Sequence, residues 1–442
     1  MENFIVTGQT PLKGTTIVSG SKNVALKALV AACLTEEEVV IQNIPLIADF
    51  FVMVEIMKKL GAHISLHDHT AIIQVKKFAH AEVSLEDAAK TRVSAMLLAP
   101  LLARKKEAII PNPGGCRLGA RPIDRIVGGI NTMSVEVTYH SEDGYFHAKT
   151  NGLKATQYTF EKNTHTGTET LILAAVLATG TTVLYNAAEE PEIDELMDLL
   201  NKMGAKVQRT GKREITIQGV EKLHGAIFTV LPDRNEIISF AIAALITGGD
   251  ITIKDAKKAQ IDTFLEKVQE IGGGVEIKGN DIRFYKHQEL KSCNITTSIY
   301  PGFMTDWQAP WAVLMTQANG VSIIHETVFE NKMGYIYELK KMGAKVELFN
   351  PKVENPHEVY NFNLSDDNPE YFHAVKITGP VKLHNAILKM IDIRAGAAVV
   401  LAALAAQGTS TIFGIDKLER GYENFDKRLS QLGAHIKRER EK

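Results

Sequence analysis

The stretch KKLGAHI, residues 58–64, recurs along the chain and decides its architecture. Each copy reads as the end of a helix, a small residue suited to the C-cap, and the start of a strand. Six registers agree, so the repeat is a strong signal. Close copies end at Val207, Val346 and Ile436, weaker copies (NTMSVEV and QEIGGGVEI) end at Val137 and Ile277, and the equivalent turn positions are Gly61, Ser134, Gly204, Gly272, Gly343 and Gly433.

The spacings of these turn positions, 73, 70, 68, 71 and 90 residues, define six units of similar length. In each unit an apolar-periodic helix ends in a small or polar turn before a β-rich run such as LATGTTVLYN, and a second helix and more strands follow. We therefore predict an α/β protein built from six β-α-β-α-β-β repeats, three per lobe. The expected lobes are residues 22–231 and residues 1–21 with 232–442, with an insertion near 351–372.

The composition is that of an ordinary globular protein. The 442 residues are 45% hydrophobic and 23% charged, and the formal net charge of −2 gives no overall reason to expect nucleic acid or an acidic membrane as partner. The N-terminus predicts no signal peptide, and the apolar run from Ala395 is too short for a membrane span. The three separated cysteines suit a reducing cytosol. Histidines such as His67 and His69 predict no metal site.

Charged residues interrupt the repeat at equivalent positions, namely the expected starts of the helices. A helix N-terminus carries unpaired N–H groups and a partial positive charge, so a cation placed there opposes the dipole unless an anion binds. If these positions served only the fold, equivalent positions would carry similar side chains, whereas here they alternate between cations and carboxylates. The first helices begin near Lys22 and Asn23, Arg92, Thr166, Asp233 and Arg234, Asp306, and Asp392 and Arg394, and the second helices begin near Arg121, Lys332 and Arg420.

These positions together predict a site for a polyanion. For any single cation the alternative is a solvated surface charge, and for Asp233, Asp306 and Asp392 it is a helix N-cap. Neither alternative explains cations at several equivalent helix starts in one chain. No GxxxxGK[ST] and no GxGxxG opens a βαβ unit, so phosphate loops of known type are absent.

A glycine- and proline-rich segment, PNPGGCRLGARPID at 111–124, contains Cys116. Its composition predicts a loop that extends from the scaffold. Arg117 and Arg121 favour the thiolate, which can attack an electrophile, whereas a neutral thiol there can donate a proton. Cys116 is therefore a candidate functional cysteine, unlike Cys33, which stands among apolar neighbours.

With these segments together, the chain resembles the enolpyruvyl transferases over essentially its full length. The cysteine loop is the most specific match, because the related shikimate enzymes lack it. The resemblance implies two inside-out α/β lobes and transfer of the enolpyruvyl group of phosphoenolpyruvate to a hydroxyl through a tetrahedral ketal. The matching stretches are SGSKN at 19–23, KTRVSAM at 90–96, PGGCRLGARPID at 113–124, NAAEEPEI at 186–193, LPDR at 231–234, TDWQAP at 305–310, ETVFEN at 326–331, DIRAGA at 392–397 and RGYE at 420–423.

The resemblance also implies roles for individual residues. Asp306 resembles the base for the 3-hydroxyl of UDP-N-acetylglucosamine, Cys116 resembles the thiol that protonates phosphoenolpyruvate or forms an adduct with it, and Lys22 belongs to the catalytic set. The implied phosphoenolpyruvate contacts are Lys22, Arg92, Arg121, Lys332, Arg394 and Arg420. The implied UDP-sugar contacts are Asn23, Arg92, Arg121, Pro122, Ile123, Asp124, His165, Thr166, Gly167, Asp306 and Val328.

The implied setting is cytoplasmic synthesis of peptidoglycan precursors, and through it cell-wall growth, cell shape and division. We expect a monomer or weak oligomer, with no metal or organic cofactor and no nucleic-acid or membrane partner.

Several positions depart from the family pattern. Lys332 stands where arginine is usual, which replaces a planar bidentate grip by a point charge. The segment NTHTGTE at 163–169 and the pair Arg125-Ile126 are unusual on the nucleotide side, and the insertion around 351–372 is atypical.

Three alternatives stay open at this stage. The chemistry could be kept with another acceptor, such as a different nucleotide sugar or a nucleotide; Cys116 argues against shikimate 3-phosphate. A DNA sliding clamp also uses six α/β units, but it should show a basic lining. Lys332 motivates the third alternative, a weakly active regulatory paralogue.

Overall fold

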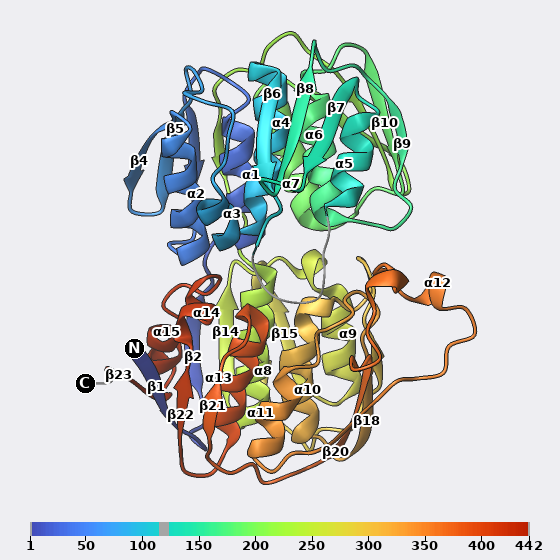
Figure 1. Cartoon of the computed structure of the whole chain (residues 1–442). Coiled ribbons are helices and arrows are strands. Elements are labelled where there is room, and N and C mark those ends of the chain that lie inside the picture. Colours follow the sequence, from blue (N-terminus) through green and yellow to red (C-terminus); the bar gives the residue numbers. More distant parts are fainter. Residues whose placement is uncertain (1, 115–122, 441–442) are drawn as a thin grey trace. The chain divides into compact units, whose positions relative to one another are not determined.

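The computed structural model describes residues 2–114 and 123–440. The described chain divides into two compact units (Figure 1). The first unit comprises residues 20–114 and 123–231, and the second comprises residues 2–19 and 232–440. Each unit is described here by itself.

The first unit contains α1 (Lys22–Ala32), β3 (Val39–Gln42), α2 (Ala48–Lys59), β4 (His63–His67), β5 (Thr70–Gln74), α3 (Leu85–Lys90), the 3₁₀-helix η1 (Arg92–Leu97), α4 (Leu98–Lys105), β6 (Glu107–Pro111), α5 (Asp124–Asn131), β7 (Val135–His140), β8 (Tyr145–Thr150), β9 (Gln157–Thr159), α6 (His165–Ala175), β10 (Thr181–Tyr185), α7 (Pro191–Lys202), β11 (Lys206–Gly211), β12 (Glu214–Gln218) and β13 (Ile227–Thr229).

The second unit contains β1 (Glu2–Thr7), β2 (Lys13–Ile17), α8 (Arg234–Thr247), β14 (Asp250–Lys254), η2 (Lys258–Gln260), α9 (Asp262–Glu270), β15 (Gly274–Lys278), β16 (Asp281–Tyr285), β17 (Ile295–Thr296), η3 (Thr305–Trp307), α10 (Gln308–Thr316), β18 (Gly320–His325), α11 (Tyr335–Lys341), β19 (Lys345–Phe349), α12 (Pro356–Val359), η4 (Leu364–Asp366), β20 (Ala374–Gly379), β21 (Ile387–Lys389), α13 (Ile393–Ala405), β22 (Thr409–Phe413), α14 (Ile415–Glu419), α15 (Phe425–Gln431) and β23 (His435–Arg440).

The strands of the described residues form six sheets, three in each unit, and all six share one arrangement. A short strand pairs in parallel with the next strand of the sheet, and two antiparallel pairings complete it, as in β9-β10-β12-β11. In the sheet β6-β8-β7 the parallel partner is reduced to a single bridge from Glu82 to Ile109. The predicted α/β fold of six repeats is confirmed.

The turn that ends each second helix explains the recurring sequence. All six turn positions found from the repeat have positive φ, from 62° at Ser134 to 104° at Gly433. Glycine adopts this region without strain, which is why five of the six positions carry it. Ser134 is the exception and keeps the turn with a side chain in the left-handed region.

Each unit has helices at its centre and sheets outside (Figure 1). In the second unit α8, α10 and α13 pack against one another and are buried along nearly their whole length. Their sequences are apolar on every face, as a helix surrounded by protein requires. The sheets instead alternate buried and exposed residues, as in β12 and β14, so one face covers the helices and the other meets solvent.

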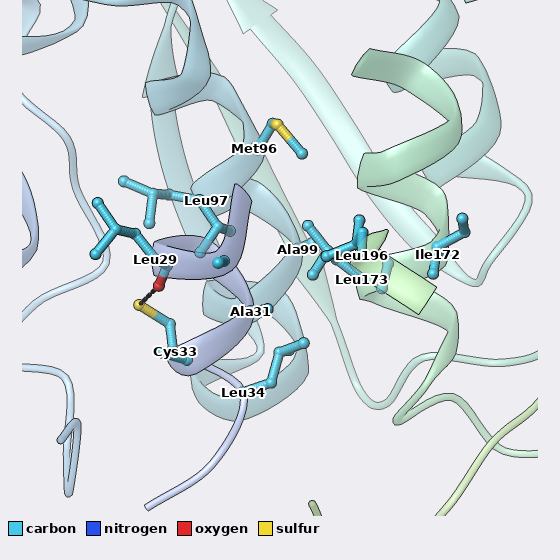
Figure 2. Close-up of a cluster of buried hydrophobic side chains, with 14 of the residues drawn as sticks. Leu29, Ala31, Cys33, Leu34, Met96, Leu97, Ala99, Ile172, Leu173 and Leu196 are labelled. Carbon is cyan, nitrogen blue, oxygen red and sulfur yellow. Dashed lines mark hydrogen bonds between the residues drawn. The ribbon is translucent and has the colours of Figure 1, made fainter. Parts of the chain in front are cut away.

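The core of the first unit shows the same logic (Figure 2). Leu29, Ala31 and Cys33 of α1 and its C-cap lie in one cluster with Leu97 and Leu173, all 1% exposed or less. The Cys33 thiol lies 3.6 Å from the Leu29 carbonyl oxygen. Cys33 is thus a core residue, as its apolar neighbours in the sequence predict.

The repeats are not contiguous in the chain. Strand β2, which leads into α1, pairs in parallel with β14 of the second unit, and β13, which leads into α8, pairs with β3 of the first. The N-terminal strand β1 lies between β22 and β23 and completes the sixth sheet. The N-terminal strand is therefore tied into a sheet whose other strands come from the C-terminal end of the chain.

The segment expected to be an insertion lies between β19 and β20 and holds α12 and η4. Tyr360 and Phe362 from the insertion are each 5% exposed, and their rings lie 4.9 Å apart. The side chain of Asn350 closes its base by donating to the Tyr371 carbonyl oxygen and accepting from the His373 amide. The insertion therefore has a small packed core of its own.

Candidate active site

Most of the predicted site residues lie at helix starts, as the repeat indicated. Lys22 and His165 are the first residues of α1 and α6, after the N-caps Ser21 and Thr164. Arg92 opens η1, Arg394 follows the first residue of α13, and Asp306 lies in η3 just before α10.

Arg420 differs from this expectation. In the sixth repeat the second helix is divided into α14 and α15, and Arg420 is the C-cap of α14 rather than part of a helix start. Lys332 precedes Gly334, the N-cap of α11.

Three of the predicted residues meet in the second unit. The Lys332 Nζ lies 2.9 Å from Asp306 Oδ1, and the Arg394 Nε lies 3.1 Å from Asp306 Oδ2. The side chains of Lys332 and Arg394 are 3% and 8% exposed, whereas that of Asp306 remains 29% exposed. The carboxylate is therefore paired with two buried cations and is still partly accessible to solvent.

This environment fixes the charge of Asp306. Burial alone would raise the pKa of the Asp306 carboxyl, but the charges of Lys332 and Arg394 and their hydrogen bonds outweigh burial and hold the pKa far below its usual range. Asp306 is thus ionised at neutral pH but a weak base while both cations hold it.

The Arg394 guanidinium has an N–H donor that its contact with Asp306 does not use. It uses Nε for Asp306, and its guanidinium carbon lies 5.4 Å from the centre of the Tyr422 ring. Its Nη1 is buried and has no hydrogen-bond partner among the described residues. A buried guanidinium donor without an acceptor is costly. An anionic ligand beside Asp306 would remove that cost.

Glu326 supports this cluster, and sequence reasoning did not assign it a role. It is fully buried; its Oε2 accepts hydrogen bonds from Thr305 Oγ1 (2.8 Å) and Gln308 Nε2 (3.0 Å), one residue before and two residues after Asp306. Its Oε1 accepts from the amides of Val328 and Phe329, at 2.8 and 3.0 Å. One carboxylate thus joins the Asp306 turn to the segment that leads to Lys332. The first glutamate of ETVFEN was the available signal.

In the first unit Lys22 is already engaged. Its Nζ lies 2.7 Å from Asp49 Oδ2, and the side chains of this pair are 10% and 6% exposed. Arg92 and Asn23 are half-buried and Asp124 is exposed. An anion that binds Lys22 must therefore share this ammonium with Asp49.

His165 takes part in a buried charge chain of the first unit. Its Nε2 lies 3.1 Å from Glu169 Oε1, and Lys27 Nζ lies 3.2 Å from Glu169 Oε2. Burial opposes the charged imidazole, but the Glu169 carboxylate outweighs it and the pKa of His165 is raised. His165 is therefore held by the protein, and the helix cap is Thr164, whose hydroxyl accepts from the Gly167 amide.

The remaining predicted nucleotide contacts have mixed surroundings. Thr166 and Val328 are half-buried and open to contact. Gly167 is required by packing, since an added Cβ would lie 2.4 Å from Thr164 Cγ2. The Ile123 side chain belongs to the hydrophobic core, which leaves only its backbone for a ligand. The predicted roles of Cys116, Arg121 and Pro122 fall on positions outside the described residues.

The other two cysteines are poor nucleophiles. Burial raises the pKa of the Cys33 thiol to about 12, and burial with the nearby Glu270 raises that of Cys293 to about 11. Among the described residues, His140, Asp143 and His147 form the one group whose ligand atoms lie close enough together to hold a metal ion, and sequence reasoning did not single this group out. In the described part of the chain, no helix has the length and apolarity that a membrane crossing requires.

The sequence of this chain matches a known protein family. The profile of EPSP synthase (3-phosphoshikimate 1-carboxyvinyltransferase) matches residues 6–429. The chain belongs to the EPSP synthase family. Within that family, it is 39% identical to the UDP-N-acetylglucosamine 1-carboxyvinyltransferase of Koribacter versatilis, over 99% of this chain and 96% of the relative. It is 37% identical to the protein of that name from Bartonella henselae, over 99% of both chains.

Solved structures of the EPSP synthase family share the fold. The enolpyruvyl transferase NikO from Streptomyces tendae superposes with a TM-score of 0.86 at 21% identity, covering 99% of this chain and 98% of NikO. EPSP synthase from Acinetobacter baumannii gives a TM-score of 0.73 at 19% identity, covering all of both chains. The two-lobed α/β architecture is therefore that of the family.

Proposed function

We propose that this chain transfers the enolpyruvyl group of phosphoenolpyruvate to the 3-hydroxyl of UDP-N-acetylglucosamine and releases phosphate. This reaction is the first committed step of peptidoglycan precursor synthesis. The observation that carries the proposal is the Asp306–Lys332–Arg394 cluster, in which the buried Arg394 Nη1 has no hydrogen-bond partner among the described residues. The chain also matches proteins named UDP-N-acetylglucosamine 1-carboxyvinyltransferase over its full length.

The cluster explains how a bound anion could switch on the base. Phosphoenolpyruvate carries a phosphate and a carboxylate, both of which compete with Asp306 for Lys332 and Arg394. As the cations turn to the ligand, the pKa of Asp306 rises toward its usual range and the carboxylate becomes able to take a proton. Phosphoenolpyruvate would thus activate the base that its own reaction needs.

The proposed steps balance with the residues available. Asp306 takes the proton of the sugar 3-hydroxyl as its oxygen bonds to C2 of phosphoenolpyruvate, and C3 receives a proton from Cys116. In the second step the Cys116 thiolate takes back a proton from C3 as the C2–O bond to phosphate breaks, which leaves the vinyl ether. The proton held by Asp306 leaves with the phosphate, so both residues return to their starting states. We assign Lys22, Arg92, Arg121 and Arg420 to the anion with Lys332 and Arg394, on the resemblance given above.

A different acceptor is the second candidate. It is favoured by the 163–169 segment, where His165 is bound to Glu169 inside the protein. We place Asn23, Asp124, Thr166 and Val328 on the acceptor side in either case. A cytoplasmic setting and a monomeric or weakly associated state belong to the proposal.

The test is phosphate release by the purified chain with phosphoenolpyruvate and UDP-N-acetylglucosamine, beside Cys116→Ala and Asp306→Asn. Release that requires the sugar nucleotide and is lost in both variants is the expected result. The exposed Lys340→Ala on α11 is a matched control and should release phosphate normally.

Two other outcomes separate the alternatives. No release, with phosphoenolpyruvate still protecting Cys116 from alkylation, would mean that the anion site is right and the acceptor is wrong. No release and no protection would overturn the proposed function.

A further inference from the structure

The insertion between β19 and β20 is bonded directly to the segment that carries Lys332. The Asn361 amide donates to the Thr327 carbonyl oxygen at 2.8 Å, and the Glu326 amide donates to the His373 carbonyl oxygen at 2.7 Å. Asn361 in the middle of the insertion and His373 at its end thus hold the residues that begin the 326–332 segment.

The insertion is stiff enough to transmit this restraint. The Tyr360 hydroxyl lies 3.2 Å from His325 Nε2 on β18, and the Tyr360 and Phe362 rings lie 5.1 and 5.3 Å from the ring of His373. The Asp367 Oδ2 lies 3.0 Å from His373 Nε2. With Asn350 closing the base, the insertion is a packed element rather than a free loop.

Glu326 connects the 326–332 segment, which the insertion holds, to the turn that contains Asp306. Its two carboxylate oxygens accept from Thr305 and Gln308 on one side and from the amides of Val328 and Phe329 on the other. A displaced 326–332 segment would therefore change the position of Lys332 relative to Asp306.

Lys332 depends on such support more than arginine would. An ammonium on four methylenes has no preferred plane and makes one short contact here, with Asp306 Oδ1, while it lies 4.8 Å from the centre of the Phe329 ring. A guanidinium holds its own geometry through a bidentate fork. Lys332 and the insertion, which the resemblance marks as departures from the family pattern, are therefore joined by one segment.

We propose that the 350–373 insertion is a brace that holds the 326–332 segment through Thr327 and Glu326, and so compensates for lysine at position 332. The insertion and Glu326 are positioning elements, and the catalytic consequence rests on the proposed function. The brace itself is a statement about hydrogen bonds and can be tested without substrates.

The sharpest variant is Asn361→Pro, which removes the N–H that donates to Thr327. The preceding Tyr360 has φ −93° and ψ 132°, a conformation that a following proline accepts. Asn361→Ala keeps the N–H and is the matched control for the side chain. Asn350→Ala, which opens the base of the insertion, is a second variant at another point.

The first readout is amide hydrogen exchange of residues 326–332 by mass spectrometry. We expect faster exchange at Val328 and Phe329 in Asn361→Pro and Asn350→Ala than in Asn361→Ala and the parent. Unchanged exchange in both would overturn the brace. Faster exchange without turnover by the parent would leave the brace standing and count against the proposed function alone.

The second readout is the compensation itself. Asn361→Pro should lower kcat/KM for phosphoenolpyruvate by about three- to tenfold, the effect of one hydrogen bond, in the Lys332 background. In a Lys332→Arg background the loss of kcat/KM should be about threefold or less, since a bidentate guanidinium is held in place by its own two hydrogen bonds. Equal losses of kcat/KM in the two backgrounds would show that the insertion has a merely structural role. They would contradict the proposal that it compensates for lysine at position 332.

A separate observation concerns the β7–β8 hairpin of the first unit. His140 and His147 lie on one face of the hairpin, since His147 pairs with Thr138 and His140 with Tyr145. Their rings stack at 4.1 Å, and His147 Nε2 lies 2.9 Å from Asp143 Oδ2 in the turn. One ligand atom from each of the three residues lies within 4.8 Å of the others.

We infer that this hairpin binds a divalent transition ion such as Zn²⁺ through two imidazoles and a carboxylate. Bonds of about 2.0–2.2 Å place tetrahedral ligand atoms about 3.3 Å apart. The 2.9 Å contact between His147 and Asp143 would lengthen and the wider separations, within 4.8 Å, would shorten, which rotation of these partly or fully exposed side chains allows. Three protein ligands leave positions for water, and the partial exposure of His140, Asp143 and His147 predicts weak, reversible binding.

Calorimetric titration of the whole chain with ZnCl₂ tests this site. We expect about one equivalent to bind, with that binding lost in His140→Ala and in His147→Ala but kept in His67→Ala, an exposed histidine of β4. Absence of binding by the parent, or isotherms that neither substitution at the hairpin alters, would overturn the site.

Discussion

The ammonium of Lys332 and the guanidinium of Arg394 hold the two oxygens of Asp306 separately, at 2.9 and 3.1 Å. A carboxylate shared in this way is charged but unreactive as a base. An incoming anion that takes over either cation changes that state. The cluster therefore links binding of the anion to activation of Asp306, and several measurable consequences follow from it.

Loss of Lys332 should weaken the anion more than the acceptor. Lys332→Ala removes one charge-assisted contact, worth about 1.5–3 kcal/mol, which corresponds to a roughly 10- to 150-fold rise in KM for phosphoenolpyruvate. Lys340 is exposed on α11, the helix that follows Lys332, and Lys340→Ala should leave this KM unchanged. Steady-state kinetics with each substrate varied in turn makes the comparison. A rise confined to the acceptor KM would move Lys332 to the other substrate.

Asp306→Asn should lower kcat by about 10²- to 10⁴-fold, the usual contribution of a general base. The pH profile gives an independent check. Since the pKa of Asp306 is held far below 3.8, its acid limb should lie below the range in which the enzyme is assayed. Lys332→Ala removes one of the two cations, so the pKa should rise and the limb should move upward in pH. An unchanged or downward-shifted limb in that variant would contradict the proposed control of Asp306.

The His165–Glu169 pair should make stability depend on pH. The pKa of His165 is raised from 6.5, so its stabilising charge is fully present below pH 6.5 and is lost as the pH rises through the folded-state value. Glu169, Lys27 and Glu190 are the charged groups that face the ring. His165→Asn should therefore lower Tm more at pH 6 than at pH 9. A difference of about 1 kcal/mol would move Tm by roughly 2–4 °C in a domain of this size.

Alkylation should distinguish the three cysteines. With pKa values of about 12 and 11, Cys33 and Cys293 have almost no thiolate near pH 8 and are buried. Brief treatment of the native protein with iodoacetamide, followed by peptide mass spectrometry, should label Cys116 alone. Labelling of Cys33 before unfolding would contradict the buried core of the first unit.

Ser134 is the one turn position of the repeat without glycine, and it has φ of 62°. Ser134→Gly should stabilise the protein by about 0.5–1 kcal/mol, because it removes the strain of a side chain in the left-handed region. Gly61→Ala should destabilise it, since its φ is 103° and the added Cβ would lie 2.9 Å from the Lys77 carbonyl oxygen. Chemical denaturation of both variants measures the two effects, and a destabilising Ser134→Gly would contradict the turn assignment.

Much of this protein could be predicted because it is repetitive. The Gly61-type turns need positive φ, the central helices need apolar residues on every face, and the sheets need alternation; each need leaves a local pattern in the sequence. Comparing six copies then exposed Asp306, Lys332 and Arg394 as exceptions at equivalent helix starts. The roles of Cys116 and Arg121 stay predictions.

What the sequence by itself determined was the set of repeats, the helix starts and the residue types available there. Only the tertiary structure decided which strands pair with β2 and β13, that Glu326 joins the Asp306 turn to the Lys332 segment, and that Asn361 of the insertion is bonded to Thr327. The physical reason is range. Turn and helix preferences act between near neighbours in the chain, so the sequence records them locally. Strand partners and buried charge contacts join residues far apart in the chain, and their spacing in the sequence does not determine which of them meet.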